Sequence, residues 1–320
     1  MRRTRMRTRR IGSLEVSVVG LGCNNFGARL DAAATRRVID AAQDAGITCL
    51  DTADVYGDGD SERFIGRALR GRRDRFVLTT KFGHPSAGED RRGHPDHVAR
   101  ALAASLERLQ VDHVDLYLLH RPDPSVPIAD TLGALGEQVR AGRVREIGCS
   151  GFDADQLLEA EGAVPDGAPR FVCVQNEYSL LRREAEASVL PTCERLGLAF
   201  VPYFPLLSGL LSGKYRKGRP LPEGARIPGS PRFEPLLDDE HMERVEALAT
   251  FAESRGRELV DLAFAWLLAR PVVASVIAGA TSAEQVRRNA ATTDWVLSPE
   301  ELAAVDGLLG PHDAAPRPAG

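Results

Sequence analysis

Residues 96–120 read DHVARALAASLERLQVDHVDLYLLH, and they contain a helical pattern followed by a strand pattern. Leu102, Leu106 and Leu109 recur at spacings of four and three residues, which places them on one face of a helix. Residues 114–119 are apolar at nearly every position, as in strands that are buried on both faces of a parallel sheet. The segment therefore predicts one unit of an α/β fold.

The same alternation of apolar strands and amphipathic helices recurs along the chain. Eight strands are predicted, at 18–21, 47–51, 76–81, 114–120, 144–150, 171–176, 199–204 and 275–278. Helical patterns follow them, at 33–45, 62–70, 96–109, 128–141, 154–160, 184–196, 240–269 (two helices) and 283–290. Eight such units in 320 residues predict a (β/α)8 TIM barrel.

A doubly wound sheet is the competing α/β architecture, and it normally carries a glycine-rich turn after its first strand. Gly20-x-Gly22 and Gly57-x-Gly59 are the two candidates here. Neither is followed by a third glycine at the spacing of the dinucleotide-binding fingerprint. The barrel is therefore favoured.

The ends of the chain carry additional elements. Two short strands, 9–11 and 15–18, predict an N-terminal β-hairpin, and residues 299–308 predict an extra C-terminal helix. We expect a single barrel domain at 9–310, a disordered basic leader at 1–8 and a flexible tail at 311–320. Met6 is an alternative to Met1 as the native start.

The composition argues against several classes of protein. A net charge of −4 does not suggest nucleic-acid binding, and no apolar run approaches the ~18 residues of a membrane span. Five cysteines, an odd number with no C-x-x-C pair, favour a reduced, cytoplasmic protein. We therefore expect a small-molecule substrate and neither a nucleic-acid nor a membrane partner; the oligomeric state is left open.

Polar side chains stand at the carboxyl ends of the predicted strands, where the active site of such a barrel lies. Asp51, Lys81 and His120 end the second, third and fourth strands, and Tyr56 follows shortly after Asp51. Three later strands end in further polar or aromatic side chains: Ser150, Gln175 with Asn176, and Tyr203. The sequence thus predicts that an acid, a phenol, an amine and an imidazole converge on one face.

A series of motifs surrounds these residues. They are DTADVYG at 51–57, SE at 61–62, GRAL at 66–69, TKFG at 80–83, SLxRL at 105–109, DLYLLHRPDP at 115–124, QNxYSLL at 175–181, PL at 205–206, SGLLSGKY at 208–215, and GATS at 279–282 with Gln285 and Asn289. In this order they resemble the aldo-keto reductase family, in its bacterial, NADPH-dependent type, from about residue 9 to residue 309. The family fold is a (β/α)8 barrel, in accord with the strand count.

The resemblance implies a mechanism for the strand-end residues. Tyr56 would be the general acid, Lys81 its electrostatic partner, Asp51 the partner of Lys81, and His120 the residue that orients and polarises the carbonyl. Because a free tyrosine has a pKa of ~10, we expect the cation of Lys81 to lower the pKa of Tyr56. The alternatives are a plain buried Asp51–Lys81 ion pair, a loop aromatic at Tyr56 and a core histidine at His120.

The resemblance also implies a site for a nicotinamide cofactor, NADPH in preference to NADH. The ring of Tyr203 would stack on the nicotinamide, with Ser150 and Gln175 at its carboxamide, and the segment 206–214 would cover the pyrophosphate. The predicted cofactor-binding residues are Gly22, Cys23, Asn24, Asp51, Ser150, Gln175, Tyr203, Pro205, Leu206, Ser208, Gly209, Leu211, Lys214, Gly279, Thr281, Gln285 and Asn289.

Two positions depart from the family pattern. Ser150 is followed by Gly151 where the family usually has asparagine, so one carboxamide contact is missing unless Asn176 or water replaces it. Arg288 stands where many relatives have a glutamate. Either Arg287 or Arg288 could reach a 2′-phosphate, or both could be solvated.

The substrate end carries less information in the sequence. The predicted substrate contacts are Phe26, Tyr56, Phe82 and His120. No metal site is predicted, because His94-x-x-His97 has no third ligand nearby. The leading hypothesis is NAD(P)H-dependent reduction of an aldehyde or ketone to an alcohol. The alternatives are a reductase dedicated to an activated keto-sugar and a redox-sensing, NADPH-binding subunit with slow turnover.

Overall fold

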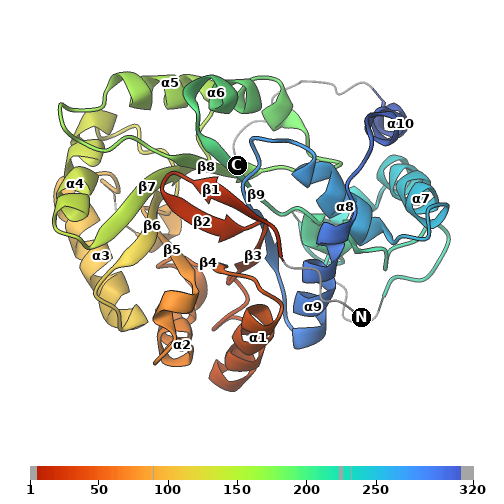
Figure 1. The fold of residues 1–320 in the computed structure, drawn as a ribbon, viewed down its shortest axis with the longest axis horizontal. Helices are drawn as coiled ribbons and strands as arrows, with labels where there is room; N and C mark the ends of the chain where they lie inside the picture. Colours follow the sequence, from red (N-terminus) through yellow and green to blue (C-terminus); the bar gives the residue numbers. More distant parts are fainter. Residues whose placement is uncertain (1–5, 89, 223–225, 232, 311–320) are drawn as a thin grey trace.

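The structure is a computed structural model that describes residues 6–88, 90–222, 226–231 and 233–310. Eight parallel strands are hydrogen-bonded in the order β10-β3-β4-β5-β6-β7-β8-β9 (Figure 1). They are β3 (Val19–Gly22), β4 (Cys49–Asp51), β5 (Val77–Phe82), β6 (Val114–Leu119), β7 (Val144–Ser150), β8 (Cys173–Glu177), β9 (Ala199–Tyr203) and β10 (Val276–Gly279).

The sheet closes on itself through the segment that leads into β10. The amide of Phe200 in β9 donates to the carbonyl of Val272 at 2.8 Å, and the amide of Ala274 donates to the carbonyl of Phe200 at 2.9 Å. This closure, with the parallel order of the strands, confirms the predicted TIM barrel. All eight predicted strands are present, each within a few residues of its expected bounds.

Helices surround the strands (Figure 1). They are α1 (Ala32–Asp44), α2 (Asp60–Ala68), α3 (Pro95–Leu109), α4 (Ile128–Arg140), α5 (Ala154–Gly162), α6 (Val189–Leu196), α7 (Asp239–Glu253), α8 (Leu259–Leu268), α9 (Ala283–Ala291) and the extra C-terminal helix α10 (Pro299–Leu309). In the described part of the chain, every helix is too short or too polar to cross a membrane.

One predicted helix, at 184–196, is shorter than expected. A short 3-10 turn covers Glu184–Glu186, and α6 begins only at Val189. Pro191 is the third residue of α6, and it has no amide hydrogen to donate to a carbonyl one turn earlier. A proline is tolerated in the first turn of a helix but not in its interior, so the helix starts just before it.

The N-terminal hairpin closes the amino end of the barrel. Its strands are β1 (Thr8–Ile11) and β2 (Leu14–Ser17), and Figure 1 shows them lying across the sheet. Ile11, Leu14 and Val16 pack in one buried cluster with the inward-facing residues of the strands. The hairpin begins at Thr8, so the predicted leader is at least one residue too long; residues 1–5 and 311–320 lie outside the described residues.

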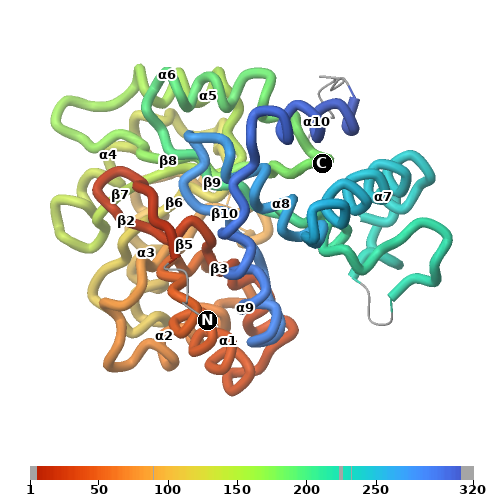
Figure 2. Tube along the Cα trace, turned by 45° about the vertical axis from the view of Figure 1, so that its right-hand side comes forward, coloured from red at the N-terminus to blue at the C-terminus, as the bar shows by residue number. Residues whose placement is uncertain are grey.

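The carboxyl end of the barrel has the longest connections. Between β9 and α8 the chain leaves the barrel, forms α7 and returns, and Figure 2 shows this excursion projecting from one side. The hairpin covers the barrel interior at the amino end, so the interior can open into a cavity at the carboxyl end.

Candidate active site

A cavity of about 590 Å³ opens at the carboxyl ends of the strands. Asp51 ends β4, Ser150 ends β7 and Tyr203 ends β9, and all three side chains line it. Gln175 of β8 and His120, directly after β6, line it as well. Five of the strand-end residues predicted from the sequence therefore come together at one site.

Lys81 lies beneath this cavity and contacts two of the other predicted catalytic residues, Asp51 and Tyr56. Its Nζ donates to Asp51 Oδ2 at 2.7 Å and to the carbonyl of Thr52 at 2.8 Å, and it lies 3.5 Å from the Tyr56 hydroxyl. Its side chain is fully buried. Gln175 Nε2 donates to the other carboxylate oxygen of Asp51 at 2.9 Å. Asp51 is therefore held from two sides, and it holds the ammonium group of Lys81 beside the phenol.

The electrostatics of this group differ from the expectation in one respect. Burial would lower the pKa of Lys81, but the Asp51 carboxylate and the Tyr56 oxygen outweigh it, so the pKa is raised. Burial raises the pKa of Tyr56, and the opposing effect of the Lys81 cation is smaller. The expected lowering of the Tyr56 pKa is therefore wrong for this structure, because desolvation of the phenolate exceeds the attraction of the ammonium. Tyr56 is a protonated phenol at neutral pH.

His120 lies on the other side of the phenol. Its ring meets the ring of Tyr56 edge-on, with centroids 5.9 Å apart. Burial, followed by the positive charges of Lys81, His84 and Arg121, lowers the pKa of His120 to about 2. The imidazole is therefore neutral at physiological pH, and within the described residues its Nδ1 has no hydrogen-bond partner. A neutral imidazole beside a protonated phenol can contact a carbonyl oxygen without adding a charge.

A buried polar network fixes the loop that carries Tyr56. The Thr52 and Ser61 hydroxyls are 2.8 Å apart, and Ser61 donates to the carbonyl of Cys23 at 3.0 Å. Glu62, in the first turn of α2, is fully buried, and it accepts hydrogen bonds from Thr80 at 2.6 Å and Arg108 at 2.6 Å. The loop between β4 and α2 is thereby tied to β3, β5 and α3.

The cavity continues away from Tyr56 along most of the predicted cofactor residues. Those that line it are Gly22, Cys23, Asn24, Asp51, Ser150, Gln175, Tyr203, Pro205, Leu206, Ser208, Gly209, Lys214, Gly279, Thr281, Gln285 and Asn289. The Ser208 hydroxyl is buried and has no hydrogen-bond partner within the described residues. Burial and the neighbouring Arg29 lower the pKa of Lys214. An unpartnered donor beside two cations fits a ligand that carries phosphate groups.

The far end of the cavity is formed by α9. Ser282 caps this helix, and Gln285 Oε1 accepts from the amide and hydroxyl of Thr281 at 2.7 and 3.1 Å. Arg288 is partly exposed but paired: it binds Asp261 at 2.8 Å and Glu258 at 2.8 Å. Its guanidinium therefore reaches the cavity already paired with carboxylates.

Three predicted contacts are corrected by the structure. Phe26, Phe82 and Leu211 are fully buried and lie outside the lining of the cavity. Phe82 instead stacks on Tyr117, with ring centroids 4.6 Å apart. The amide of Leu211 is used within its own loop, where it donates to the carbonyl of Leu206 at 3.2 Å.

Asn176 does not replace the missing asparagine after Ser150. Its Oδ1 accepts from the amide of Gly151 at 2.9 Å, and its Nδ2 donates to the carbonyl of Phe152 at 2.8 Å. Both polar groups of the side chain therefore hold the loop after β7, and Asn176 lies outside the cavity lining.

Four basic residues in the lining were not predicted individually: Arg29, and three that lie in segments expected at the substrate end (the loop 82–93, the segment after His120 and the loop 218–235), His84, Arg121 and Arg226. Arg121 and His84 stand within the quoted motifs or directly after them, so their proximity to His120 and Lys81 in the sequence was an available signal. Arg29 and Arg226 lie in loops whose direction the sequence pattern does not give.

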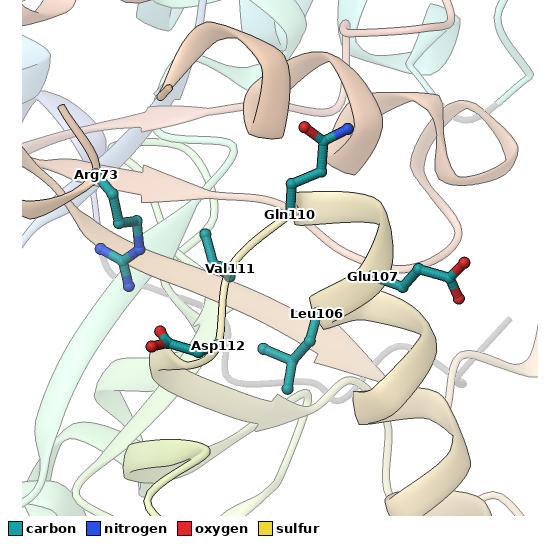
Figure 3. Close-up of a pocket in the computed structure, with 6 residues that line it drawn as sticks. All are labelled: Arg73, Leu106, Glu107, Gln110, Val111 and Asp112. Carbon is teal, nitrogen blue, oxygen red and sulfur yellow. The ribbon is translucent and has the colours of Figure 1, made fainter. Parts of the chain in front are cut away.

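A second cavity lies elsewhere, at the C-terminal end of α3 (Figure 3). Leu106, Glu107 and Gln110 line one side of it, and Val111 and Asp112 precede β6. It is therefore at the amino end of the barrel, away from Tyr56. Among the described residues, no group of three or more histidine, cysteine, aspartate or glutamate side chains is arranged to hold a metal ion.

Comparisons with known proteins agree with this geometry. The sequence profile of the aldo/keto reductase family matches residues 18–309. The chain is similar to a probable voltage-gated potassium channel subunit beta of Arabidopsis thaliana, with 32% identity over 92% of this chain and 94% of that protein. It is also similar to protein tas of Escherichia coli, with 32% identity over 92% of this chain and 95% of that protein.

One solved structure is similar over almost the whole chain. It is the holo form of the aldo-keto reductase AKR11C1 from Bacillus halodurans, with 32% identity, a TM-score of 0.79, and coverage of 97% of each chain.

Proposed function

The chain belongs to the aldo/keto reductase family, and we propose that it reduces an aldehyde or ketone to an alcohol through Tyr56, Lys81, Asp51 and His120. The family implies an oxidoreductase that uses a nicotinamide cofactor for carbonyl reduction. The roles of the individual residues and the choice of NADPH are our proposal.

The observation that carries the proposal is the buried contact between Lys81, Asp51 and Tyr56. A protonated phenol 3.5 Å from a fully buried ammonium group is a proton donor whose conjugate base is stabilised as it forms. Binding alone does not require this arrangement. A lysine that merely completed the core would not need its charge beside a tyrosine that lines the cavity.

The mechanism assigns one task to each side chain. When bound, the reduced cofactor supplies the hydride that adds to the carbonyl carbon. Tyr56 donates its hydroxyl proton to the carbonyl oxygen as negative charge develops there, and Lys81 stabilises the resulting phenolate. His120, neutral at working pH, orients the same oxygen. Asp51 keeps Lys81 in place against the cost of burying a lone ammonium group.

The cofactor site fits a dinucleotide diphosphate. Lys214 and Arg29 would face its phosphates, with the unpartnered Ser208 hydroxyl as a further donor. Arg288 would contact a 2′-phosphate, which supports NADPH over NADH. Its pairing with Glu258 weakens that preference, because the carboxylate offsets part of its charge.

The test is the rate of NADPH oxidation with a panel of aliphatic, aromatic, dicarbonyl and sugar aldehydes. Tyr56→Phe should retain NADPH binding, measured by quenching of tryptophan fluorescence, and lose at least about 10²-fold in kcat. Tyr117→Phe is the matched control, because the hydroxyl of this buried tyrosine has no hydrogen-bond partner among the described residues. Rates in Tyr56→Phe within a few-fold of the parent would remove Tyr56 from its role.

A second candidate function rests on one relative, which is named as a channel subunit. In that case the chain would be a redox-sensing subunit that binds NADPH and turns over slowly. Tight NADPH binding without turnover across the whole panel, together with a stable partner, would favour this candidate over the reductase.

A further inference from the structure

Arg121 borders the catalytic residues, and no role has been assigned to it above. It follows His120 directly, lines the cavity, and has its Nη1 3.5 Å from the hydroxyl of Tyr203. It also lies close enough to His84 and His120 for its charge to affect both rings. The guanidinium is therefore at the substrate end of the cavity and not at the end formed by Lys214 and Arg288.

The backbone leaves room for this side chain at Gly151. A Cβ at that position would lie 2.4 Å from Arg121 Nη1 and 3.2 Å from its Cδ, so the guanidinium would have to shift from its present place. The φ of +73° is also one that other residues rarely adopt. Asn176 fixes the segment by bonding the amide of Gly151. Glycine at 151 thus lets the Arg121 guanidinium lie against the backbone at this point.

The charge of Arg121 is not compensated by a carboxylate within the described residues. Other partly buried arginines are paired: Arg73 with Asp115 at 2.6 Å, and Arg108 with Glu62 at 2.6 Å. The acid nearest to Arg121 in the sequence, Asp123, accepts from the amide of Gly93 and from Ser125. Because Asp51 is already bound by Lys81, it does not offset the charge of Arg121, and among the described residues that charge stays uncompensated.

His84 adds a hydrogen-bond donor to this cationic side of the cavity. Its ring lies 4.7 Å from that of His120, and its Nδ1 accepts the backbone amide of Ser86 at 3.2 Å. A neutral imidazole that accepts at Nδ1 carries its proton at Nε2. Burial and the charges of Arg121 and Arg92 lower the pKa of His84, which keeps the ring in that neutral form.

We propose that the substrate carries, besides its carbonyl group, an anionic carboxylate or phosphate ester that is bound by Arg121 and His84. This inference rests on the proposed reductase function and specifies the substrate class. A guanidinium binds either anion through two parallel hydrogen bonds, so both chemistries fit. Catalysis remains with Tyr56, Lys81 and His120, while Arg121 is a specificity-determining residue.

The experiment compares aldehydes in matched pairs that differ in charge. One arm uses 4-carboxybenzaldehyde against its methyl ester, and succinic semialdehyde against butanal. The other arm uses glyceraldehyde 3-phosphate against glyceraldehyde. We expect the parent to have a lower KM for the charged member of at least one pair. The arm in which that difference is larger identifies the carboxylate or the phosphate ester as the natural group.

Arg121→Gln should raise the KM for the charged aldehyde by about ten- to a hundredfold and leave the neutral aldehyde within about twofold. Arg121→Lys should recover part of the loss, because it restores the charge but not the paired donors. Arg143→Gln, which removes one positive charge from an exposed position before β7, is the control for net charge. A second readout, which does not require a charged aldehyde as substrate, is competitive inhibition of neutral-aldehyde reduction by benzoate and by inorganic phosphate at saturating NADPH; both should weaken in Arg121→Gln.

The outcomes separate this inference from the proposed function. If the parent reduces charged and neutral aldehydes with equal KM, the anion site is refuted and the reductase function stands. An anion preference that persists in Arg121→Gln also refutes it. If the parent reduces no aldehyde while binding NADPH, the reductase function itself fails, and the substrate class fails with it.

Discussion

The ion pair between Lys81 and Asp51 allows the structural and catalytic roles of a buried charge to be separated. The nitrogen and oxygen are 2.7 Å apart, Lys81 is fully buried and the Asp51 side chain is 6% exposed. Lys81→Met leaves the Asp51 carboxylate buried without its cation, which costs about 3–5 kcal/mol. The substitution also removes the hydrogen bond to the carbonyl of Thr52. This lost hydrogen bond accounts for about 1–3 kcal/mol of the total.

The double variant Asp51→Asn/Lys81→Met removes both charges. The uncompensated charge disappears, so only the loss at Thr52 remains and the double variant should be about 2 kcal/mol more stable than Lys81→Met. Urea unfolding measures these differences through the fluorescence of Trp266 and Trp295, which are both buried. Far-UV circular dichroism should give the same midpoints if unfolding is two-state.

Activity should not follow stability in this series. The double variant is folded, but without Lys81 the pKa of Tyr56 rises further, because the cation that opposes burial is gone. We expect carbonyl reduction to remain lost. If the free energy of unfolding of Lys81→Met lies within about 1 kcal/mol of that of the parent, the electrostatic argument for the pair is refuted. Parent-like activity in the double variant would refute the role of Lys81 in proton donation.

Three further predictions concern charged groups around the cavity. Burial and the neighbouring Glu62 raise the pKa of Asp54 to about 6, so the folded state binds the Asp54 proton more tightly than the unfolded chain does. The free energy of unfolding should therefore fall by at most about 3 kcal/mol as the pH rises from about 4 to about 6. In Asp54→Asn, the free energy of unfolding measured with urea should no longer fall across this pH range. If it falls as in the parent, Asp54 is not the group responsible. Because the pKa of His120 is lowered to about 2, the pH profile of kcat/KM should contain no ionisation of His120 between pH 5 and pH 8; an acid limb that disappears in His120→Ala would show otherwise. Glu258→Gln should remove one of the two carboxylates paired with Arg288, while Asp261 stays bound, and raise the preference for NADPH over NADH several-fold, measured as the ratio of kcat/KM values; an unchanged ratio would argue that Arg288 does not meet the 2′-phosphate.

The barrel was predictable because its signal is local and repeated. Each apolar strand followed by an amphipathic helix is readable within about twenty residues, and eight repeats leave few architectures. Asp51, Lys81 and His120 were predictable for the same reason, since the end of a parallel strand is defined by the sequence of that strand. The break before α6 was missed although Pro191 was visible, because the helical pattern was read through the proline.

The substrate contacts were less predictable because side-chain direction depends on register. Lys81 and Phe82 are neighbours in β5, and successive side chains of a strand point to opposite faces. Once Lys81 points into the barrel toward Asp51, Phe82 must point outward, where it packs on Tyr117. The alternation rule could have excluded Phe82 from the site. The raised pKa of Tyr56 could not have been derived, because it depends on burial that no local pattern gives.

Gly151 shows why a departure from a family pattern must be placed in three dimensions before it is interpreted. In the sequence, glycine after Ser150 indicates the loss of one cofactor contact. In the structure, the same glycine leaves space for the guanidinium of Arg121, which stands 30 positions earlier in the chain. The two positions are therefore neighbours in the structure: a side chain at 151 would shift the guanidinium of Arg121, and a small residue at 121 would remove its contact with Tyr203. Under our proposal, specificity would depend on these two loop positions, whereas Asp51 and Lys81 are held by strands β4 and β5 themselves.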